Sequence, residues 1–119
     1  MIEIKNETEK VILVGVSLSD QDDTKESLEE LKDLVSTAGA ETVGMVIQNR
    51  EQQHPGTYVG KGKIEELKSM IWELRATGIV CDDELSPAQM KNLQDELDVK
   101  VMDRTLIILD IFAARASTS

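Results

Sequence analysis

Cysteine and long apolar runs are scarce in this sequence, and each scarcity excludes a class of protein. The chain has one cysteine, Cys81, so no disulfide can form within it, which fits the reducing cytosol. No segment approaches the roughly 20 consecutive apolar residues of a membrane-spanning helix. The first residues, Met1 to Lys5, lack the apolar stretch of a secretory signal. We therefore expect a soluble, cytoplasmic protein.

Positive charge is also in short supply. Asp and Glu together number 23 against 13 Lys and Arg, which gives a formal net charge of −10. Wide, non-specific binding to nucleic acid depends on neutralising phosphates, so this balance excludes it. A focused contact between RNA and a local basic patch is still compatible with an acidic domain.

Apolar residues are plentiful, at 40% of 119 residues, and they follow two periodicities. A chain of this length forms one domain and buries roughly two-thirds of the surface that it exposes when unfolded. Short apolar runs predict strands: these are residues 11–16, about 42–48, 79–81 and 99–102. Apolar residues at helical spacing predict helices between the strands: Leu28 to Ala38, Ile64 to Leu74, and Met90 to Leu97.

Residues with special backbone preferences mark the ends of these helices. Asp23 and Glu26 offer a capping box for the first helix, and Gly39 suits its left-handed end. The second helix is expected to stop at Gly78. The segment from Ser86 to Gln89 predicts the start of the third helix, with a serine cap, a proline in the first position and a glutamine that completes a capping box.

Strands that alternate with single helices are joined by right-handed crossovers into a parallel sheet. We therefore predict an α/β fold over residues 1–103, in which a four-stranded parallel sheet carries helices on both faces. Residues 104–119 are predicted to start a further helix, which connects to domains that this chain does not contain.

The stretch from Arg104 to Arg115 differs from the earlier helices because apolar residues surround nearly the whole helix axis. They are Leu106, Ile107, Ile108, Leu109, Ile111 and Phe112. Such a helix requires cover on more than one side, and the sheet supplies only one. We expect either a homodimer through residues 106–115 or disorder from about Ala113 onward. Alternatively, the helix covers one sheet face and leaves one or two side chains in water.

The carboxyl edge of a doubly wound sheet is where ligands bind, and a glycine-rich segment falls there. Its glycines permit close backbone approach, its two lysines suit an anion or an RNA phosphate, and its tyrosine suits stacking on a base. The candidate nucleotide- or RNA-binding residues are Tyr58, Gly60, Lys61, Gly62 and Lys63. The spacing is not that of a Walker loop. The alternative is that the glycines only shape a turn, the lysines are solvated and the ring packs over the loop.

A second group of candidates follows the third strand at the same edge. Asp82, Asp83 and Glu84 either hold a divalent cation with their carboxylates or favour the start of the third helix and face solvent. The second interpretation is favoured, and no metal site is predicted. Ser86 and Arg104 complete the strand-end candidates.

No catalytic residue is predicted. His54 lies in a loop without a nucleophile beside it, so no catalytic triad can be assembled. Cys81 lies in an apolar strand, which favours an inert core thiol. Trp72 falls off the apolar stripe of its helix, and exposed tryptophans are enriched at interfaces.

Five segments carry a resemblance in their order and spacing. They are Val11 to Val16, Ser27 to Leu31, Thr57 to Leu67, Asp82 to Gln89 with Asn92 and Leu93, and Val101 to Thr105 with Ile108 to Ala116. Together they resemble the amino-terminal domain of the HflX family of ribosome-associated GTPases. The resemblance covers nearly the whole chain beyond its first few residues.

The resemblance implies a cytoplasmic GTP-binding protein that associates with the large ribosomal subunit in translation and helps to split or rescue stalled ribosomes. It implies that the GTPase motifs, with GTP and magnesium as ligands, lie in a later domain after a helical hairpin. The expected partners are the large subunit with its rRNA and those missing helical and GTPase domains. We expect no cofactor in this chain and no GTP hydrolysis by it alone, although the full-length protein is a hydrolase.

Three roles are open to the chain itself. The first is a docking and regulatory domain at the large ribosomal subunit. The second is a nucleotide-binding domain for ATP or GTP with weak ATPase activity of its own. The third is a structural domain that restrains the GTPase domain.

Overall fold

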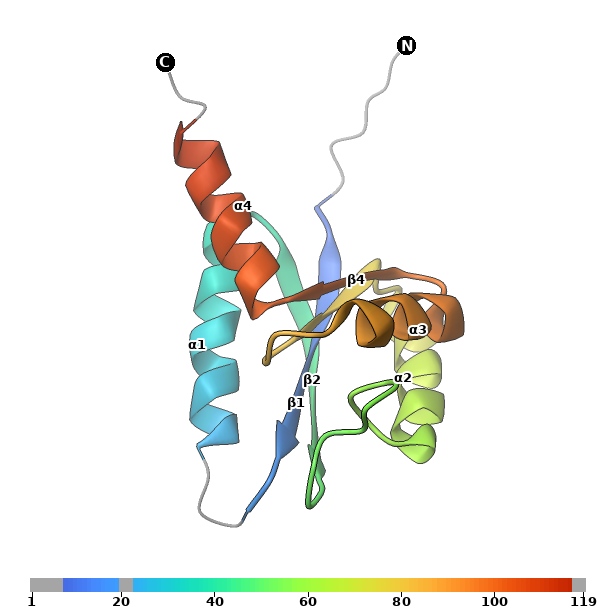
Figure 1. The fold of residues 1–119 in the computed structure, drawn as a ribbon. Helices are drawn as coiled ribbons and strands as arrows, with labels where there is room; N and C mark the ends of the chain where they lie inside the picture. Colours follow the sequence, from blue (N-terminus) through green and yellow to red (C-terminus); the bar gives the residue numbers. More distant parts are fainter. Residues whose placement is uncertain (1–7, 20–22, 117–119) are drawn as a thin grey trace.

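A computed structural model describes residues 8–19 and 23–116, with side chains described as far as residue 114 (Figure 1). The elements in chain order are β1 (Lys10–Ser17), α1 (Thr24–Thr37), β2 (Glu41–Asn49), α2 (Lys61–Leu74), β3 (Gly78–Cys81), α3 (Pro87–Leu97), β4 (Lys100–Asp103) and α4 (Arg104–Ala116). Among these helices, none has the length and apolar content to cross a membrane.

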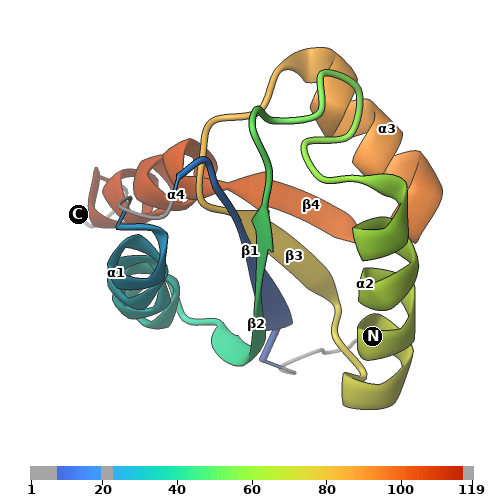
Figure 2. The ribbon, with the colours of Figure 1, turned by 90° about the horizontal axis from the view of Figure 1, so that it is seen from below.

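The four strands form one parallel sheet in the order β2-β1-β3-β4. Helices α1 and α4 cover one face, and α2 and α3 cover the other (Figure 2). The prediction of a four-stranded parallel sheet with helices on both faces is confirmed. The strand order reverses between β1 and β3, so the carboxyl ends of these two strands form the topological switch point where such sheets bind ligands.

The continuous apolar run of β1 arises because both faces of this central strand are buried. Ile12 and Val14 point to the α2 and α3 side, whereas Val11 and Leu13 point to the α1 and α4 side. All four side chains are fully buried. Burying a side chain of this kind stabilises the fold by about 1.5–3 kcal/mol, so the sheet is held mainly from its centre.

The helix starts are partly as predicted. The capping box of α3 is confirmed, because Ser86 Oγ accepts the Gln89 backbone N–H at 3.1 Å and Gln89 Oε1 accepts that of Ser86 at 2.9 Å. The capping box predicted for Asp23 is wrong. Asp23 stands at the N-cap of α1, but its side chain makes no cap hydrogen bond. Its backbone (φ −101°, ψ 33°) is not the extended conformation of side-chain caps.

The helix ends show one further correction. Gly39 adopts the predicted left-handed conformation after α1, with φ +96°. Helix α2, however, ends at Leu74, where Arg75 takes the left-handed conformation (φ 57°). Gly78 instead begins β3. A Cβ atom at Gly78 would lie 2.7 Å from the Lys100 carbonyl oxygen, so this glycine permits close approach to β4 rather than ending a helix.

Helix α4 packs on the sheet through only part of its surface. Ile107 is buried and Ile111 is half-buried, whereas Leu106, Leu109 and Phe112 are 41%, 55% and 64% exposed. The expectation that the sheet covers only one side of this helix is confirmed. Helix α4 continues beyond Ala113 to Ala116, and residues 117–119 lie outside the described part of the chain.

Candidate functional site

The glycine-rich segment begins with a compact turn built around His54. The backbones of His54 and Tyr58 pair with each other, at 3.1 Å from His54 N–H to Tyr58 O and 2.8 Å from Tyr58 N–H to His54 O. The ring nitrogen Nδ1 of His54 accepts the backbone N–H groups of Gly56 and Thr57 at 3.0 and 3.1 Å. His54 therefore shapes the loop, and its ring nitrogen also lies 3.3 Å from the Thr57 hydroxyl.

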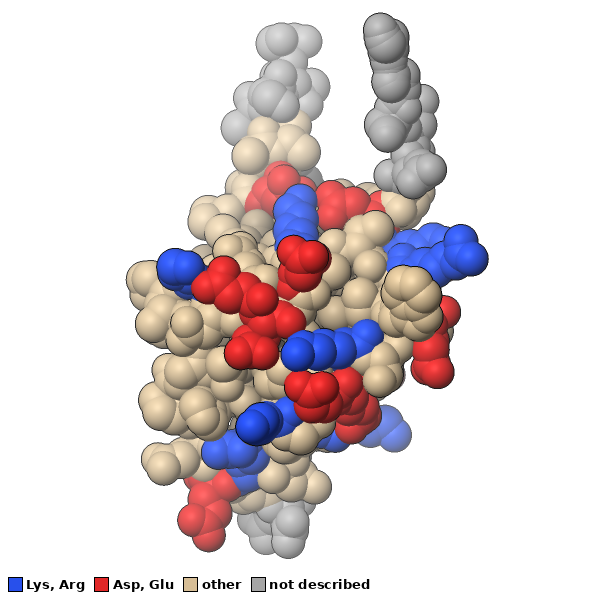
Figure 3. Space-filling view, turned by 90° about the vertical axis from the view of Figure 1, so that its right-hand side faces the viewer, with Lys and Arg blue, Asp and Glu red and all other residues tan. Residues whose placement is uncertain are grey.

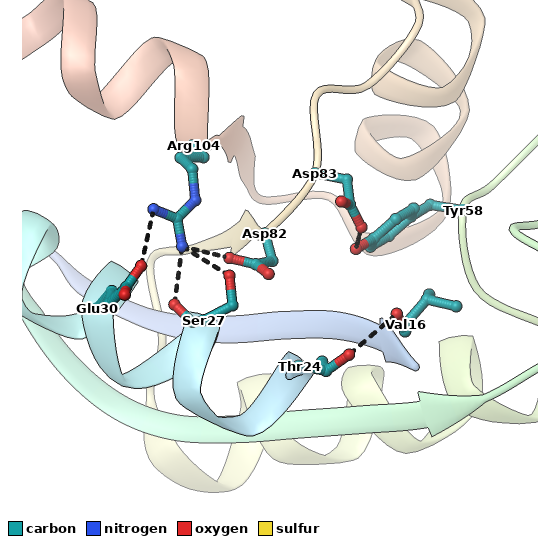
Figure 4. Close-up of polar contacts among 8 residues, drawn as sticks. All are labelled: Val16, Thr24, Ser27, Glu30, Tyr58, Asp82, Asp83 and Arg104. Atoms are coloured by element: carbon teal, nitrogen blue, oxygen red, sulfur yellow. Dashed lines mark hydrogen bonds and ion pairs between the residues drawn. The ribbon is translucent and has the colours of Figure 1, made fainter. Parts of the chain in front are cut away.

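Tyr58 is part of the core and not of the loop surface. Its side chain is fully buried, and its hydroxyl donates to Asp83 Oδ2 at 2.6 Å (Figure 4). Burial, followed by the hydrogen bond to Asp83, raises the pKa of Tyr58 far above its ordinary value. The expectation of an exposed ring that stacks on a base does not hold in this structure, because the apolar cluster under α2 and α3 encloses the ring.

The remaining loop candidates lie at the start of α2. The backbone N–H of Gly60 donates to Gln48 Oε1 at 2.7 Å, so this amide is already used. Lys63 forms a 2.9 Å ion pair with Glu66 one turn away. Lys61 and Gly62 are exposed. The structure thus brings Gly60 to Lys63 together, and Lys61 is the member that offers a solvent-facing positive charge.

The acidic turn after β3 is bound into the fold. Asp82 Oδ1 lies 2.8 Å from Arg104 Nη2, and the same nitrogen donates to Ser27 O at 2.7 Å and to Ser27 Oγ at 2.9 Å (Figure 4). The side chain of Asp82 is only 9% exposed, and Asp83 accepts from Tyr58. The favoured interpretation had Asp82, Asp83 and Glu84 face solvent, and this is wrong for Asp82 and Asp83, whose carboxylates are held by Arg104 and Tyr58. It holds for Glu84, which is exposed.

Sequence reasoning missed Asp103. This buried residue at the end of β4 accepts the Leu85 N–H at 2.8 Å and the Leu106 N–H at 2.9 Å. An aspartate three residues before a helical amide is the usual N-cap arrangement, so the sequence did carry this signal. Among the described residues, no group of three or more His, Cys, Asp or Glu side chains is arranged to hold a metal ion.

The turn around His54 is held against α3 by two side chains whose contact with the loop was not predicted. Gln89 Nε2 donates to the carbonyl oxygen of His54 and Asn92 Nδ2 donates to that of Gly56, each at 2.9 Å. Gln89 thus serves both the capping box and the loop. Residue spacing cannot reveal these contacts, because they join segments more than thirty residues apart.

A hollow of about 240 Å³ lies at the switch point between β1 and β3. Its lining includes Asp23, Ser27, Gln53, Asp82 and Asp83. Three carboxylates in this lining disfavour the phosphates of a nucleotide, because like charges repel.

Cys81, the last residue of β3, is fully buried. Burial raises the pKa of its thiol, so the thiol stays protonated and unreactive, as predicted.

The α2 and α3 side of the molecule carries charges of both signs (Figure 3). Most of its lysines are paired with neighbouring acids; the pairs are Lys63–Glu66, Lys68–Glu65, Lys68–Glu96 and Lys91–Asp95. Trp72, also on α2, is 84% exposed, as its position off the apolar stripe predicted. This side therefore offers isolated contact points and no wide basic field.

Known proteins resemble this chain in sequence. Residues 25–113 match the family described as GTP-binding GTPase N-terminal. The chain is 68% identical to the GTPase HflX of Lacrimispora saccharolytica over 99% of its own length and 28% of that protein. It is 40% identical to the GTPase HflX of Escherichia coli over 92% of its own length and 26% of that protein. The chain thus spans about a quarter of the length of these curated relatives.

A solved structure shares the fold. A GTP-binding protein from the archaeon Sulfolobus solfataricus, crystallised in complex with GDP, superimposes with a TM-score of 0.65 at 24% sequence identity. The match covers 87% of this chain and 30% of the archaeal chain. At this identity the likeness concerns the fold alone.

Proposed function

This chain belongs to the GTP-binding GTPase N-terminal family, and from that premise we propose that it is the docking and regulatory domain of an HflX-type GTP-binding protein that acts at the large ribosomal subunit. The observation that supports docking against the rest of a longer protein is the apolar stripe of α4, formed by Leu106, Leu109 and Phe112, whereas the contact with the large subunit is assigned to the start of α2. An exposed apolar stripe beside the buried side of a helix marks an interaction surface. The rest of a longer protein is its proposed occupant.

Arg104 supports a regulatory role because it fixes the direction of the docking helix. It is the first residue of α4, and its guanidinium joins α4 to Ser27 on α1 and to Asp82 after β3. Any domain that packs against the stripe is therefore held in a defined orientation to the switch point. Domains docked on α4 would sense a change at the ends of β1 and β3 through this residue.

The proposed ribosome contact is a focused one, centred on Lys61 and Lys63 at the start of α2. A net charge of −10, the ion pair of Lys63 with Glu66 and that of Lys68 with Glu65 leave little general attraction for RNA, so Lys61 is the main solvent-facing charge of this contact. Reversing both lysines to glutamate should lower binding to isolated large subunits at least about tenfold, since each phosphate contact adds to affinity. A matched control is Lys25→Glu with Lys32→Glu, because both of these lysines are exposed on α1.

Co-sedimentation of the longer protein with large subunits measures this directly. Equal binding by the parent and by the Lys61→Glu, Lys63→Glu variant would remove the contact from these residues. If the Lys25→Glu, Lys32→Glu control lost as much binding, the change in net charge would explain the effect and no specific contact would be assigned to Lys61 and Lys63.

Two alternative roles have specific observations behind them. The glycines at the start of α2 favour a nucleotide site, although the Gly60 amide is committed to Gln48 and the adjacent hollow is acidic. The α4 stripe also suits a domain that only restrains the GTPase domain. GTP turnover by the longer protein, compared with a form lacking residues 1–103, tests restraint: faster turnover without the domain supports it, and unchanged turnover opposes it.

A further inference from the structure

Strand β2 forms one edge of the sheet, and the described residues supply no strand for its outer side. It is long for an edge strand, with nine residues from Glu41 to Asn49. Ile47, near its carboxyl end, is 37% exposed. Edge strands present unpaired backbone groups to any chain that can lie alongside them.

The direction of one hydrogen bond shows which backbone groups point outward. The N–H of Arg50 donates to Ser17 O on β1 at 3.0 Å, so Arg50 faces inward. Successive residues of a strand turn their backbone groups to opposite sides. Gln48 and Val46 therefore share the inward direction. Met45, Ile47 and Asn49 present their N–H and C=O groups to the outside.

This outer edge lacks the features that usually protect an edge strand. The segment from Gly44 to Asn49 contains no charged residue and no proline. The one irregularity in its pairing with β1 is a register shift at Val43, which precedes the segment. Natural edge strands commonly carry a lysine, a proline or a bulge that prevents pairing with another chain. In β2 the bulge at Val43 lies before the uncharged segment from Gly44 to Asn49 and does not protect it.

We propose that a second copy of this chain pairs with the outer edge of β2, antiparallel and with Ile47 opposite Ile47. With this register, Met45 of one copy lies opposite Asn49 of the other, so all three outward-facing residues of each strand face an outward-facing residue of its partner. In an antiparallel ladder, each such pair exchanges two N–H···O=C bonds. The two-fold axis uses the same patch on both copies, so the interface closes as a dimer and does not propagate.

The charges on α1 favour this arrangement. Helices α1 and α4 lie side by side (Figure 2), and Ser27 of α1 faces Arg104 of α4. Lys25 and Glu29 are each two residues from Ser27, about half a turn round the helix, so helical geometry puts them on the flank away from α4. A Cβ atom at Gly15, the β1 partner of Ile47, would lie 2.8 Å from Thr24 and 3.3 Å from Leu28, so this part of α1 is level with the dyad. The two-fold axis therefore places Lys25 of one copy level with Glu29 of the other.

The test is the mass of the chain in solution. Sedimentation velocity should show a dimer that dissociates on dilution. Ile47→Pro should make the chain monomeric and leave its melting behaviour near that of the parent, because the N–H that is removed does not bond to β1. The control for the rival surface is Leu109→Lys with Phe112→Lys on α4, which should remain dimeric. A strictly monomeric parent would overturn the proposal, and so would a dimer that only the α4 variant abolishes.

Cross-linking gives a second measurement that does not depend on how the proline variant folds. Cα atoms of opposed hydrogen-bonded residues lie about 5.5 Å apart, within the range of a disulfide. Under mild oxidation, Ile47→Cys should become a covalent dimer in high yield, whereas Ser69→Cys, at an exposed position on α2, should not. Cys81 is fully buried and does not compete. Equal cross-linking of the two variants would count against the β2 interface.

Discussion

Arg104 Nη2 and Asp82 Oδ1 lie 2.8 Å apart and join the first residue of α4 to the residue that follows β3. Both groups are largely shielded from water, with side chains 25% and 9% exposed. The same nitrogen also bonds to the backbone and hydroxyl of Ser27 on α1. Three segments that are distant in sequence therefore meet at one guanidinium group.

Replacing Arg104 with methionine should destabilise the domain by about 1–3 kcal/mol, because the Asp82 carboxylate loses its charged partner in a shielded place. The matched control is Glu30→Gln. Glu30 lies 3.9 Å from the same guanidinium, but its side chain is 74% exposed. Exposed pairs of this kind contribute little, so the control should stay within about 0.5 kcal/mol of the parent. Urea unfolding measures both, and similar losses in the two variants would refute the role assigned to Asp82.

Tyr58 should remain protonated in the folded chain well above pH 10. Its pKa is raised by burial and by Asp83, whereas the unfolded chain titrates near the ordinary value of 10.0. Above pH 10 the unfolded state therefore binds fewer protons than the folded state, and stability falls by up to about 1.4 kcal/mol per pH unit. Tyr58 is the single tyrosine of the chain, so tyrosinate absorbance reports on it alone. Appearance of tyrosinate at pH 10 before any unfolding would contradict the buried position.

Removing only the hydroxyl isolates the contact with Asp83. Tyr58→Phe keeps the buried ring but leaves Asp83 without this donor, which should cost about 1–2 kcal/mol at neutral pH. The variant should also lose the part of the alkaline destabilisation that Tyr58 causes. Denaturant unfolding at pH 7 and pH 10.5, with Trp72→Phe as a control at an exposed ring, measures both effects.

Substitutions on the buried and exposed sides of α4 should differ in their effect on the stability of the chain. Ile107→Ala removes buried volume from the cluster beneath α4 and should cost about 2–4 kcal/mol. Leu109→Lys with Phe112→Lys changes exposed positions and should alter the stability of the isolated chain by less than about 1 kcal/mol. In the longer protein, the same double variant should loosen the contact between this domain and its neighbour, seen as increased protease sensitivity of residues 104–116. Unchanged sensitivity would mean that nothing docks on the stripe.

The isolated chain should hydrolyse no GTP. The hollow at the switch point is lined by carboxylates, and the Thr57 hydroxyl, which lies 3.3 Å from His54 Nδ1, donates to Val59 O at 2.8 Å. Neither ATP nor GTP at millimolar concentration should raise the melting temperature, because a ligand bound only by the folded state must stabilise it. Turnover that persists after purification to homogeneity, or a clear rise in melting temperature, would favour the nucleotide-binding alternative.

The sequence predicts the elements of this fold well because β1 is a continuous apolar run and the apolar residues of α1 recur at helical spacing. The α3 capping box could also be predicted, because its two hydrogen bonds join residues three positions apart. The errors occurred where one residue type serves two purposes. Gly78 suggests the end of a helix, but its function is to let Lys100 of β4 come close. Asp82 and Tyr58 resemble surface residues of a ligand loop, yet partners 22 and 25 residues away hold them inside. Contacts between residues so far apart in the chain produce no periodic pattern in the sequence.

The position of β1 at the centre of the sheet has a consequence for synthesis. Its second neighbour, β3, begins at Gly78, so roughly half the chain separates two strands that must lie side by side. Until Gly78 to Cys81 leave the ribosome, the apolar segment from Val11 to Val14 has an open edge on the side that β3 later occupies. Closing so distant a pairing is intrinsically slow, and the half-made sheet is prone to aggregate in the meantime. Nascent chains stalled before β3 are therefore expected to need a chaperone, whereas chains released beyond β4 fold unaided.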